Sequence, residues 1–214
     1  KSMTLQQREY FLALSESRSK DADSLDRPNM RGVKRSITDK YSDPAHFVYE
    51  LIQNADDALA TSATFIVYDD KLIFKHNGEK QFTISKFGDK TGKRGDINSI
   101  TGFAFSSKKD DCNTIGKFGV GFKSVYQYSN TPKIYDDKFW FKIENYIIPT
   151  LLESDHELRN QGETLFEFDY KDLFDCTSEY CLSGFMSQKR YGDQLVIGTL
   201  FLKKYWTHYD YEKE

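Results

Sequence analysis

A stripe of acidic and amide side chains lies within a segment that is predicted to be helical. Glu50, Asn54 and Asp57 are spaced at i, i+4 and i+7, so they share one narrow face of a helix with 3.6 residues per turn. Apolar residues flank this stripe on both sides, and the stripe carries no Lys or Arg. A well-capped, solvated helix edge explains the pattern, and so does a set of polar groups that converges on a ligand.

Three closely spaced glycines occur in residues 116–124, whose sequence is GKFGVGFKS. Glycine lets the backbone approach a ligand closely, and the start of a following helix offers unpaired N–H groups to an anion. The spacing is neither that of the dinucleotide-binding fingerprint nor that of the P-loop. The segment therefore predicts either an anion site or a set of tight turns.

A third polar feature, His76-Asn77-Gly78, directly follows a predicted strand. An Asn-Gly pair after a strand is typical of a turn. A histidine that only caps the end of the strand is the structural interpretation of His76.

The elements that must position these residues are two helices and several hairpins. Residues 3–20 predict a polar helix with a thin apolar stripe (Leu5, Tyr10, Phe11, Leu14), and residues 21–32 predict a loop or strap. The strongest helix signal starts at Asp43 and Pro44. Its apolar positions, at helical spacing, are Phe47, Val48, Leu51, Ile52, Ala55, Ala58 and Leu59.

The remaining chain favours an antiparallel arrangement. Predicted strands are 64–68, 72–75, 164–168 and 194–202, and residues 117–128 predict a further helix. Residues 86–116 have loop composition with at most one short helix. VYDDKLIFK (67–75) is similar to IYDDKFWFK (134–142), which we interpret as two similar hairpins, not an internal duplication. Alternating helices and hairpins predict an α+β fold, not a parallel βαβ sheet.

Composition excludes several classes of function. The 214 residues include 30 basic and 33 acidic side chains, for a net charge of −3, so no basic excess favours nucleic-acid binding. No apolar run approaches the length of a membrane span. Three cysteines without paired short spacing favour a reducing, cytoplasmic compartment. The start Lys1-Ser2-Met3 suggests a part of a longer protein.

The order of the three polar features resembles that of the GHKL ATPase superfamily, which includes gyrase B, heat-shock chaperones, histidine kinases and mismatch-repair ATPases. ELIQNADDA (50–58) resembles its E-x-x-x-N-x-x-D-A motif, and GKFGVGFKSVY (116–126) resembles the chaperone form of its glycine motif. With HFVYELIQNADDA and HNG, the chain is most similar to the N-terminal ATP-binding domain of sacsin and its bacterial relatives. The resemblance is dense over residues 43–144.

This resemblance implies a Bergerat-type two-layer α/β sandwich at 43–214, with a mixed, mainly antiparallel sheet and helices on one face. Residues 1–42 would form a helix and strap packed on it. The cofactors would be ATP and Mg²⁺, with Asn54 as the metal ligand and Glu50 as the catalytic base. The other nucleotide-binding residues implied are Asp57, Ala58, His76, Asn77, Gly78, Ser107 and Lys108 of a lid, Gly116, Lys117, Phe118, Gly119, Val120, Gly121, Phe122, Lys123 and Thr164.

One departure from the superfamily concerns the base. Its second motif has an aspartate that accepts the adenine N6 proton, where this chain has His76. A neutral histidine accepts through one ring nitrogen, and the Asn77 amide would accept while donating to the base. We expect slow ATP hydrolysis that drives a conformational switch in a larger protein.

The alternatives are a non-catalytic nucleotide sensor or protein-interaction module, and a histidine-kinase core, which the chaperone-like FGVGFKS makes less favourable. Partners implied are an adenine nucleotide, downstream domains of the same polypeptide and a second copy in a homodimer, with neither membrane nor nucleic acid. A basic residue from a following domain completes the site in such enzymes, so the isolated chain is expected to hydrolyse ATP poorly. Lys123 is the only local substitute for that residue.

Overall fold

The computed structural model describes residues 3–25, 44–68, 70–91, 94–102 and 121–170. They include one six-stranded sheet with the order β1-β2-β6-β3-β4-β5, in which every neighbouring pair is antiparallel. Its strands are β1 (Ala63–Val67), β2 (Lys71–His76), β3 (Lys133–Tyr135), β4 (Trp140–Glu144), β5 (Ile148–Leu151) and β6 (Thr164–Asp169). The predicted α+β class is confirmed, although the described strands form no parallel pair.

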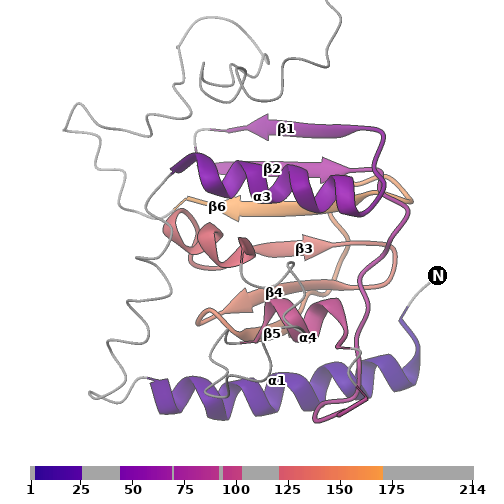
Figure 1. The fold of residues 1–214 in the computed structure, drawn as a ribbon, viewed down its shortest axis with the longest axis vertical. Helices are drawn as coiled ribbons and strands as arrows, with labels where there is room; N and C mark the ends of the chain where they lie inside the picture. Colours follow the sequence, from indigo (N-terminus) through magenta and orange to yellow (C-terminus); the bar gives the residue numbers. More distant parts are fainter. Residues whose placement is uncertain (1–2, 26–43, 69, 92–93, 103–120, 171–214) are drawn as a thin grey trace, which may run out of the picture.

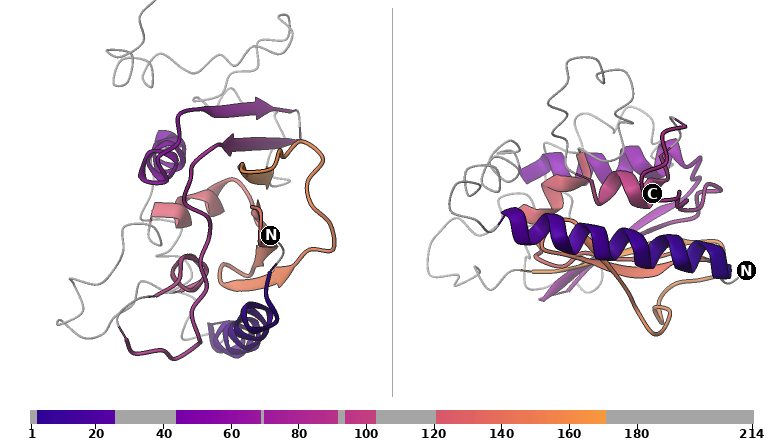
Figure 2. Two further views of the ribbon diagram at one scale, coloured as in Figure 1. Left: turned by 90° about the vertical axis from the view of Figure 1, so that its right-hand side faces the viewer. Right: turned by 90° about the horizontal axis from the view of Figure 1, so that it is seen from below.

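Helices form the second layer. α3 (Pro44–Asp57), α4 (Asp96–Ile100) and the 3₁₀ helix η2 (Phe122–Gln127) lie over one face of the sheet, as Figures 1 and 2 show. The long helix α1 (Leu5–Leu25) runs along the edge formed by β5 and packs against that strand. One edge of the sheet is thereby covered, while β1 forms the other edge.

The core between the two layers is rich in aromatic rings. Leu72 and Phe74 of β2 point into it, whereas the intervening Ile73 packs on the opposite face, as the period of two in a strand requires. Phe166 and Phe168 continue the same row on β6. Burying such a side chain completely is worth about 1.5–3 kcal/mol, so this row fixes which face of β2 and β6 meets the helices.

The N-terminal helix differs from its prediction at both ends. Phe11 and Leu14 are fully buried, and the Phe11 ring meets Phe141 edge-on at 5.7 Å, but Leu5 is exposed. The helix also continues to Leu25 through residues that were predicted to be a loop. The polar composition of residues 21–25 does not end the helix. Tertiary packing, here against β5, supplies most of the stability of such a helix.

The second helix follows its prediction closely. Phe47, Val48, Leu51 and Ala55 are buried against the sheet, while Leu59 is exposed with a positive φ of 63° just beyond the helix. The expectation that Leu59 belongs to the apolar stripe was wrong, because a left-handed residue at this position ends the helix.

The hairpin predictions are confirmed for the described residues. β1 pairs with β2, and β3 pairs with β4, while β6 lies between β2 and β3. Within the predicted helix at 117–128 the structure describes the 3₁₀ helix η2 at Phe122–Gln127, and the short helix allowed within 86–116 is α4. The predicted strand at 194–202 and the strap after residue 25 lie outside the described residues.

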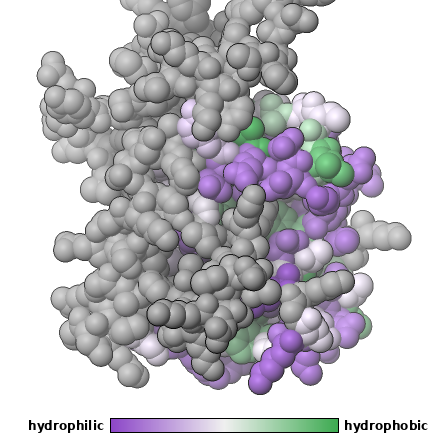
Figure 3. Space-filling model, in the orientation of Figure 1, coloured by the Kyte–Doolittle hydropathy of each residue, from purple (hydrophilic) through white to green (hydrophobic). Residues whose placement is uncertain are grey.

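The face of the sheet away from α3 is covered by residues 152–163. Leu152 and Leu158 of this connection pack against a small apolar cluster of Ile73, Tyr135 and Leu165. In the view onto the helix-covered face, the described surface is dominated by hydrophilic side chains with isolated apolar patches (Figure 3).

Candidate functional site

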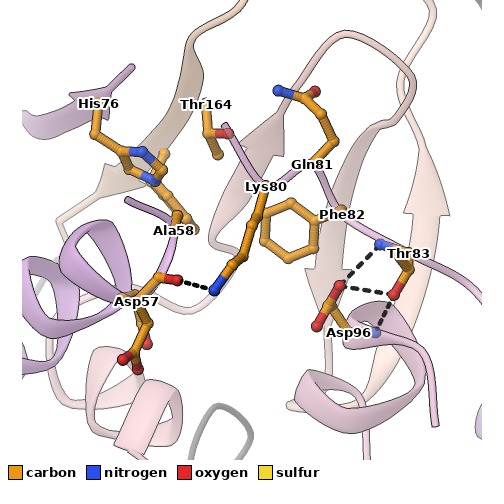
Figure 4. Close-up of a pocket in the computed structure, with 11 residues that line it drawn as sticks. Asp57, Ala58, His76, Lys80, Gln81, Phe82, Thr83, Asp96 and Thr164 are labelled. Carbon is orange, nitrogen blue, oxygen red and sulfur yellow. Dashed lines mark hydrogen bonds between the residues drawn. The ribbon is translucent and has the colours of Figure 1, made fainter. Parts of the chain in front are cut away.

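A cleft of about 520 Å³ opens between the helix layer and the ends of two central strands. It lies where α3 ends, where β2 ends and β6 begins, and where the segment 80–83 approaches the start of α4 (Figure 4). Its lining residues are Asn54, Asp57, Ala58, His76, Lys80, Gln81, Phe82, Thr83, Asp96, Thr164 and Phe166. This volume is typical of a small-molecule site.

Two buried polar side-chain atoms, on residues that line this cleft, have no hydrogen-bond partner among the described residues. They are the side-chain nitrogen of Asn54, a residue 4% exposed, and the hydroxyl of Thr164, a residue 1% exposed. A buried polar atom without a partner costs about 1–3 kcal/mol, so folded proteins rarely retain one. Both residues line the cleft, so they are candidates for binding a ligand there.

His76 stands directly opposite Thr164 across β2 and β6. Its Nδ1 accepts a hydrogen bond from the backbone N–H of Gly78 at 3.1 Å. Burial lowers the pKa of His76 to about 4, against a smaller opposing effect of the Glu163 charge. The ring is therefore neutral near pH 7, with its proton on Nε2.

This tautomer corrects the expected role of His76. We expected the ring to accept a proton from the ligand, but the nitrogen that accepts is already used by Gly78. His76 consequently carries its N–H on Nε2, the ring nitrogen that is not bonded to Gly78. The sequence could not reveal this, because the backbone contact that selects the tautomer forms only in the folded turn.

Asn77 is also used differently from the expectation. Its side-chain oxygen accepts from the backbone N–H groups of Thr61 and Ser62, and its side-chain nitrogen donates to the Thr61 hydroxyl. These bonds fasten the turn after β2 to the segment that follows α3. Asn77 therefore acts in turn formation, and the same turn explains Gly78, since a Cβ there would come within 2.6 Å of the Ala58 side chain.

Glu50 and Gly121 meet outside the lining of the cleft. A Cβ at Gly121 would collide with the Glu50 carboxylate, so only glycine leaves room for that side chain at the start of η2. The half-buried Glu50 lies one helical turn before Asn54 on α3. The structure thus brings the predicted acid and the third glycine of the cluster together.

Lys123 lies in a separate, buried environment. Its ammonium donates to the carbonyl oxygens of Ile100 and Tyr146, each at 2.6 Å, and lies 5.5 Å from the centre of the Tyr126 ring. Burial lowers its pKa to about 7, with the nearby Arg18 charge acting in the same direction. These bonds tie η2 to α4 and to the turn before β5, and Lys123 does not line the cleft.

Of the residues predicted for the site, the cleft gathers Asn54, Asp57, Ala58, His76 and Thr164. Phe122 is buried in the core, where its ring faces Phe166. Outside the described residues are Ser107, Lys108, Gly116, Lys117, Phe118, Gly119 and Val120.

Sequence reasoning missed the far wall of the cleft. Asp96 accepts from both the backbone N–H and the hydroxyl of Thr83, and that hydroxyl accepts from the backbone N–H of Asp96 (Figure 4). Lys80 closes the near side by donating to the backbone oxygen of Asp57 at 2.5 Å. Thr83 and Asp96 are separated by 13 residues, so no local sequence pattern indicates that they pair. Lys80 could have been proposed as a cleft residue, because it follows the predicted turn at residues 76–78.

The fold and the cleft together define a class: a two-layer α+β sandwich with a cleft between its layers that polar side chains partly line. A family model for the sacsin domain matches residues 30–191, which is more than half of the chain. The chain belongs to this family. No described helix is both long and apolar enough to cross a membrane.

Two similar proteins are much longer than this chain. Protein NO VEIN of Arabidopsis thaliana is 32% identical over 136 residues, which is 58% of this chain and 4% of that protein. Sacsin of Homo sapiens is 30% identical over 118 residues, which is 49% of this chain and 2% of that protein. The similarity therefore concerns one small region of each.

Proposed function

We propose that this chain is a GHKL-type nucleotide-binding domain that binds Mg²⁺-ATP and drives a conformational switch by slow hydrolysis within a larger protein. The observation that carries the proposal is the pair of buried atoms without a partner among the described residues, on Asn54 and Thr164, two residues that line one cleft. Membership of the sacsin-domain family is consistent with it.

The residues of the cleft fit a nucleotide-bound magnesium ion. Within the described residues no three His, Cys, Asp or Glu side chains gather as a metal cluster. Mg²⁺ keeps most of its waters and binds phosphate oxygens, so one protein ligand is sufficient. Asn54 would supply its side-chain oxygen to the ion, and its unpartnered side-chain nitrogen would donate to a phosphate oxygen, while the ion would neutralise charge on the phosphates.

Glu50 is the proposed general base that orients a water. It lies on α3 one turn from Asn54, and Gly121 holds space for its carboxylate at the beginning of η2. A non-catalytic sensor or interaction module, the competing function, has no need of a carboxylate in this place. Turnover therefore decides between the two.

The test is calorimetric titration with ATP, in magnesium and in chelator, of the wild type and the Asn54→Ala variant. We expect magnesium to strengthen wild-type binding at least about tenfold and to have little effect on the variant, which lacks the oxygen ligand. Asn130→Ala, at an exposed position after η2, is the matched control and should behave as the wild type. Equal affinity of wild type and Asn54→Ala in both buffers would contradict the assignment.

A phosphate-release assay separates the enzyme from the sensor. Phosphate release by this chain alone should be near background, and in the longer protein Glu50→Gln should lower it by about 10² to 10⁴ while ATP still binds. If the Glu50→Gln variant of the longer protein retained full turnover, Glu50 would be excluded as the general base.

A further inference from the structure

A surface loop between Ser85 and Gly95 has its two ends held together. The backbone N–H of Gly95 donates to the Ser85 hydroxyl at 3.1 Å, and the Asn98 side chain bonds both the backbone N–H and the backbone oxygen of Ser85, at 2.9 and 3.0 Å. A Cβ at Gly95 would come within 2.7 Å of the Ile84 backbone, so the ends of the loop are in close contact. Surface loops whose ends meet in this way frequently carry function.

The described part of this loop, residues 86–91 and 94, is termed the basic loop. It carries Lys86, Lys90 and Arg94 against one acidic residue, Asp89, although the whole chain has a net charge of −3. These three basic residues are exposed, and none forms an ion pair within the part of the chain that the structure describes. The lysines of the sheet are, by contrast, each paired with a glutamate: Lys71, Lys75, Lys133 and Lys142. The basic loop therefore presents positive charge that the described structure does not neutralise.

An aromatic ring is exposed among these charges. Phe87 is 43% exposed, and the guanidinium of Arg18 lies 5.8 Å from the centre of its ring. This contact holds the basic loop beside α1, along the lower side of the molecule in Figure 1. Removing a large aromatic side chain from water is favourable, so a partner that covers Phe87 gains affinity beyond the attraction of the charges.

The charge around the basic loop decides which kind of anionic partner fits. α1 carries four acidic and three basic side chains, and Asp21 lies next to the loop because it is bonded to Arg18. A nucleic acid or an anionic membrane is an extended surface that also meets these carboxylates, within the roughly 8 Å over which charges act at physiological salt. A short acidic peptide contacts the basic loop without covering α1, so it avoids that repulsion.

We infer that the basic loop is a docking site for a short acidic peptide segment that contains an aromatic or aliphatic side chain. The carboxylates of the peptide pair with Lys86, Lys90 and Arg94, and its apolar side chain packs on Phe87. Exposed ion pairs are individually weak, so several must act together and their sum depends strongly on salt. None of these residues lines the cleft, and the docking site is therefore independent of the nucleotide site proposed above.

The experiment measures, by fluorescence anisotropy, the affinity of the 214-residue chain for a labelled peptide of sequence EEEFEEE. Raising the salt from about 50 to about 300 mM should weaken binding at least about fivefold. The peptide QQQFQQQ should bind at least about tenfold more weakly, because it keeps the ring and lacks the carboxylates.

Two variants of the basic loop separate charge from apolar contact. Lys86→Ala combined with Lys90→Ala should weaken binding of EEEFEEE at least about fivefold, and Phe87→Ala should weaken it about threefold or more. Arg8→Ala combined with Lys138→Ala removes the same charge outside the basic loop and is the matched control, which should bind as the wild type.

The possible results divide into support and contradiction. The proposal is overturned if EEEFEEE does not bind, if QQQFQQQ binds equally well, or if the loop variant and the control variant lose the same affinity. Tighter binding of single-stranded oligothymidylate, or of phosphatidylserine vesicles, that is lost in the loop variant would assign the loop to an extended polyanion instead. If circular dichroism showed that the double loop variant does not fold, Phe87→Ala and QQQFQQQ would decide.

Discussion

Polar side chains on the two sides of the sheet differ in whether they have hydrogen-bond partners. On the helix-covered side, Asn54 of α3 and Thr164 of β6 keep buried polar atoms that have no hydrogen-bond partner among the described residues. On the other face, Glu167 accepts from Lys71 at 3.3 Å and from Lys133 at 2.5 Å, and it lies 2.9 Å from Nε2 of His156. Polar atoms next to the cleft therefore lack hydrogen-bond partners among the described residues, whereas the Glu167 carboxylate on the other face has several.

The two histidines make the same contrast. His156 lies beside the Glu167 carboxylate, and its Nδ1 accepts from the backbone N–H of Leu158. His76 also accepts a backbone N–H, yet no carboxylate is hydrogen-bonded to it in the described structure. Both of the ring nitrogens of His156 are used within the protein, whereas only one nitrogen of His76 is.

Ion pairs and hydrogen bonds on the face of the sheet away from α3 position the residues just before Thr164. Arg159, whose side chain is 6% exposed, binds the carboxylates of Asp155 and Asp137 and donates to the backbone oxygen of Glu163, the residue before Thr164. Gly162 also donates to Asp137, at 2.9 Å. These bonds hold the residues just before Thr164, while the Thr164 hydroxyl on the opposite face has no partner among the described residues.

The largest expected effect is a loss of stability on the face of the sheet away from α3. Arg159→Ala should lower the free energy of unfolding by about 3 kcal/mol, because it leaves two partly buried carboxylates without their partner. Denaturation with urea measures the loss. Lys20→Ala, which breaks an exposed pair with Glu16, is the control and should change stability by less than about 1 kcal/mol. Similar effects of the two variants would mean that the two kinds of ion pair are equivalent.

The second-largest expected effect is a pH dependence of the free energy of unfolding that comes from His76. The pKa of His76 is about 4 in the folded chain and near 6.5 when unfolded, so the unfolded state binds more protons between these values. Its contribution to stability is complete above the unfolded value and is lost as the pH falls. Between about pH 7 and pH 5 the loss should be about 2 kcal/mol.

His76→Gln isolates this contribution. The difference in unfolding free energy between wild type and variant should change by that amount over the same pH range, because the variant has no ring to protonate. A difference that is constant with pH would mean that His76 is as easily protonated in the folded chain as in the unfolded one.

Much of this contrast could be predicted from local sequence. The spacing of Glu50, Asn54 and Asp57 placed three polar groups on one face of α3, and in the structure Asn54 and Asp57 line the cleft. The strand predicted at residues 72–75 lies within β2 (Lys71–His76), which places Leu72 and Phe74 in the core. Both patterns depend only on the repeat of a helix or a strand, which short segments carry on their own.

What could not be predicted depends on contacts between distant segments. The tautomer of His76 depends on the turn geometry at Gly78, and the position of Asp96 depends on a bond to Thr83. Arg159 binds Asp137, which is 22 residues away, so no periodicity relates them. The helix η2 packs against α3, a contact between distant segments that local helix propensity does not include.

The smallest expected effect reverses the usual sign of a core substitution. Thr164→Val keeps the shape of the side chain and removes a buried hydroxyl that has no partner, so it should raise the free energy of unfolding by about 1 kcal/mol. Thr150→Val is the matched control, because the Thr150 hydroxyl donates to Glu144 at 2.7 Å and its removal should cost a similar amount. Urea denaturation of both variants without nucleotide measures the pair of shifts. A stabilised Thr164→Val that also binds nucleotide more weakly would identify the open hydroxyl as retained for the ligand at the expense of stability. Destabilisation by both variants would instead show that the Thr164 hydroxyl is satisfied in solution, and the contrast between the two faces would fail at this residue.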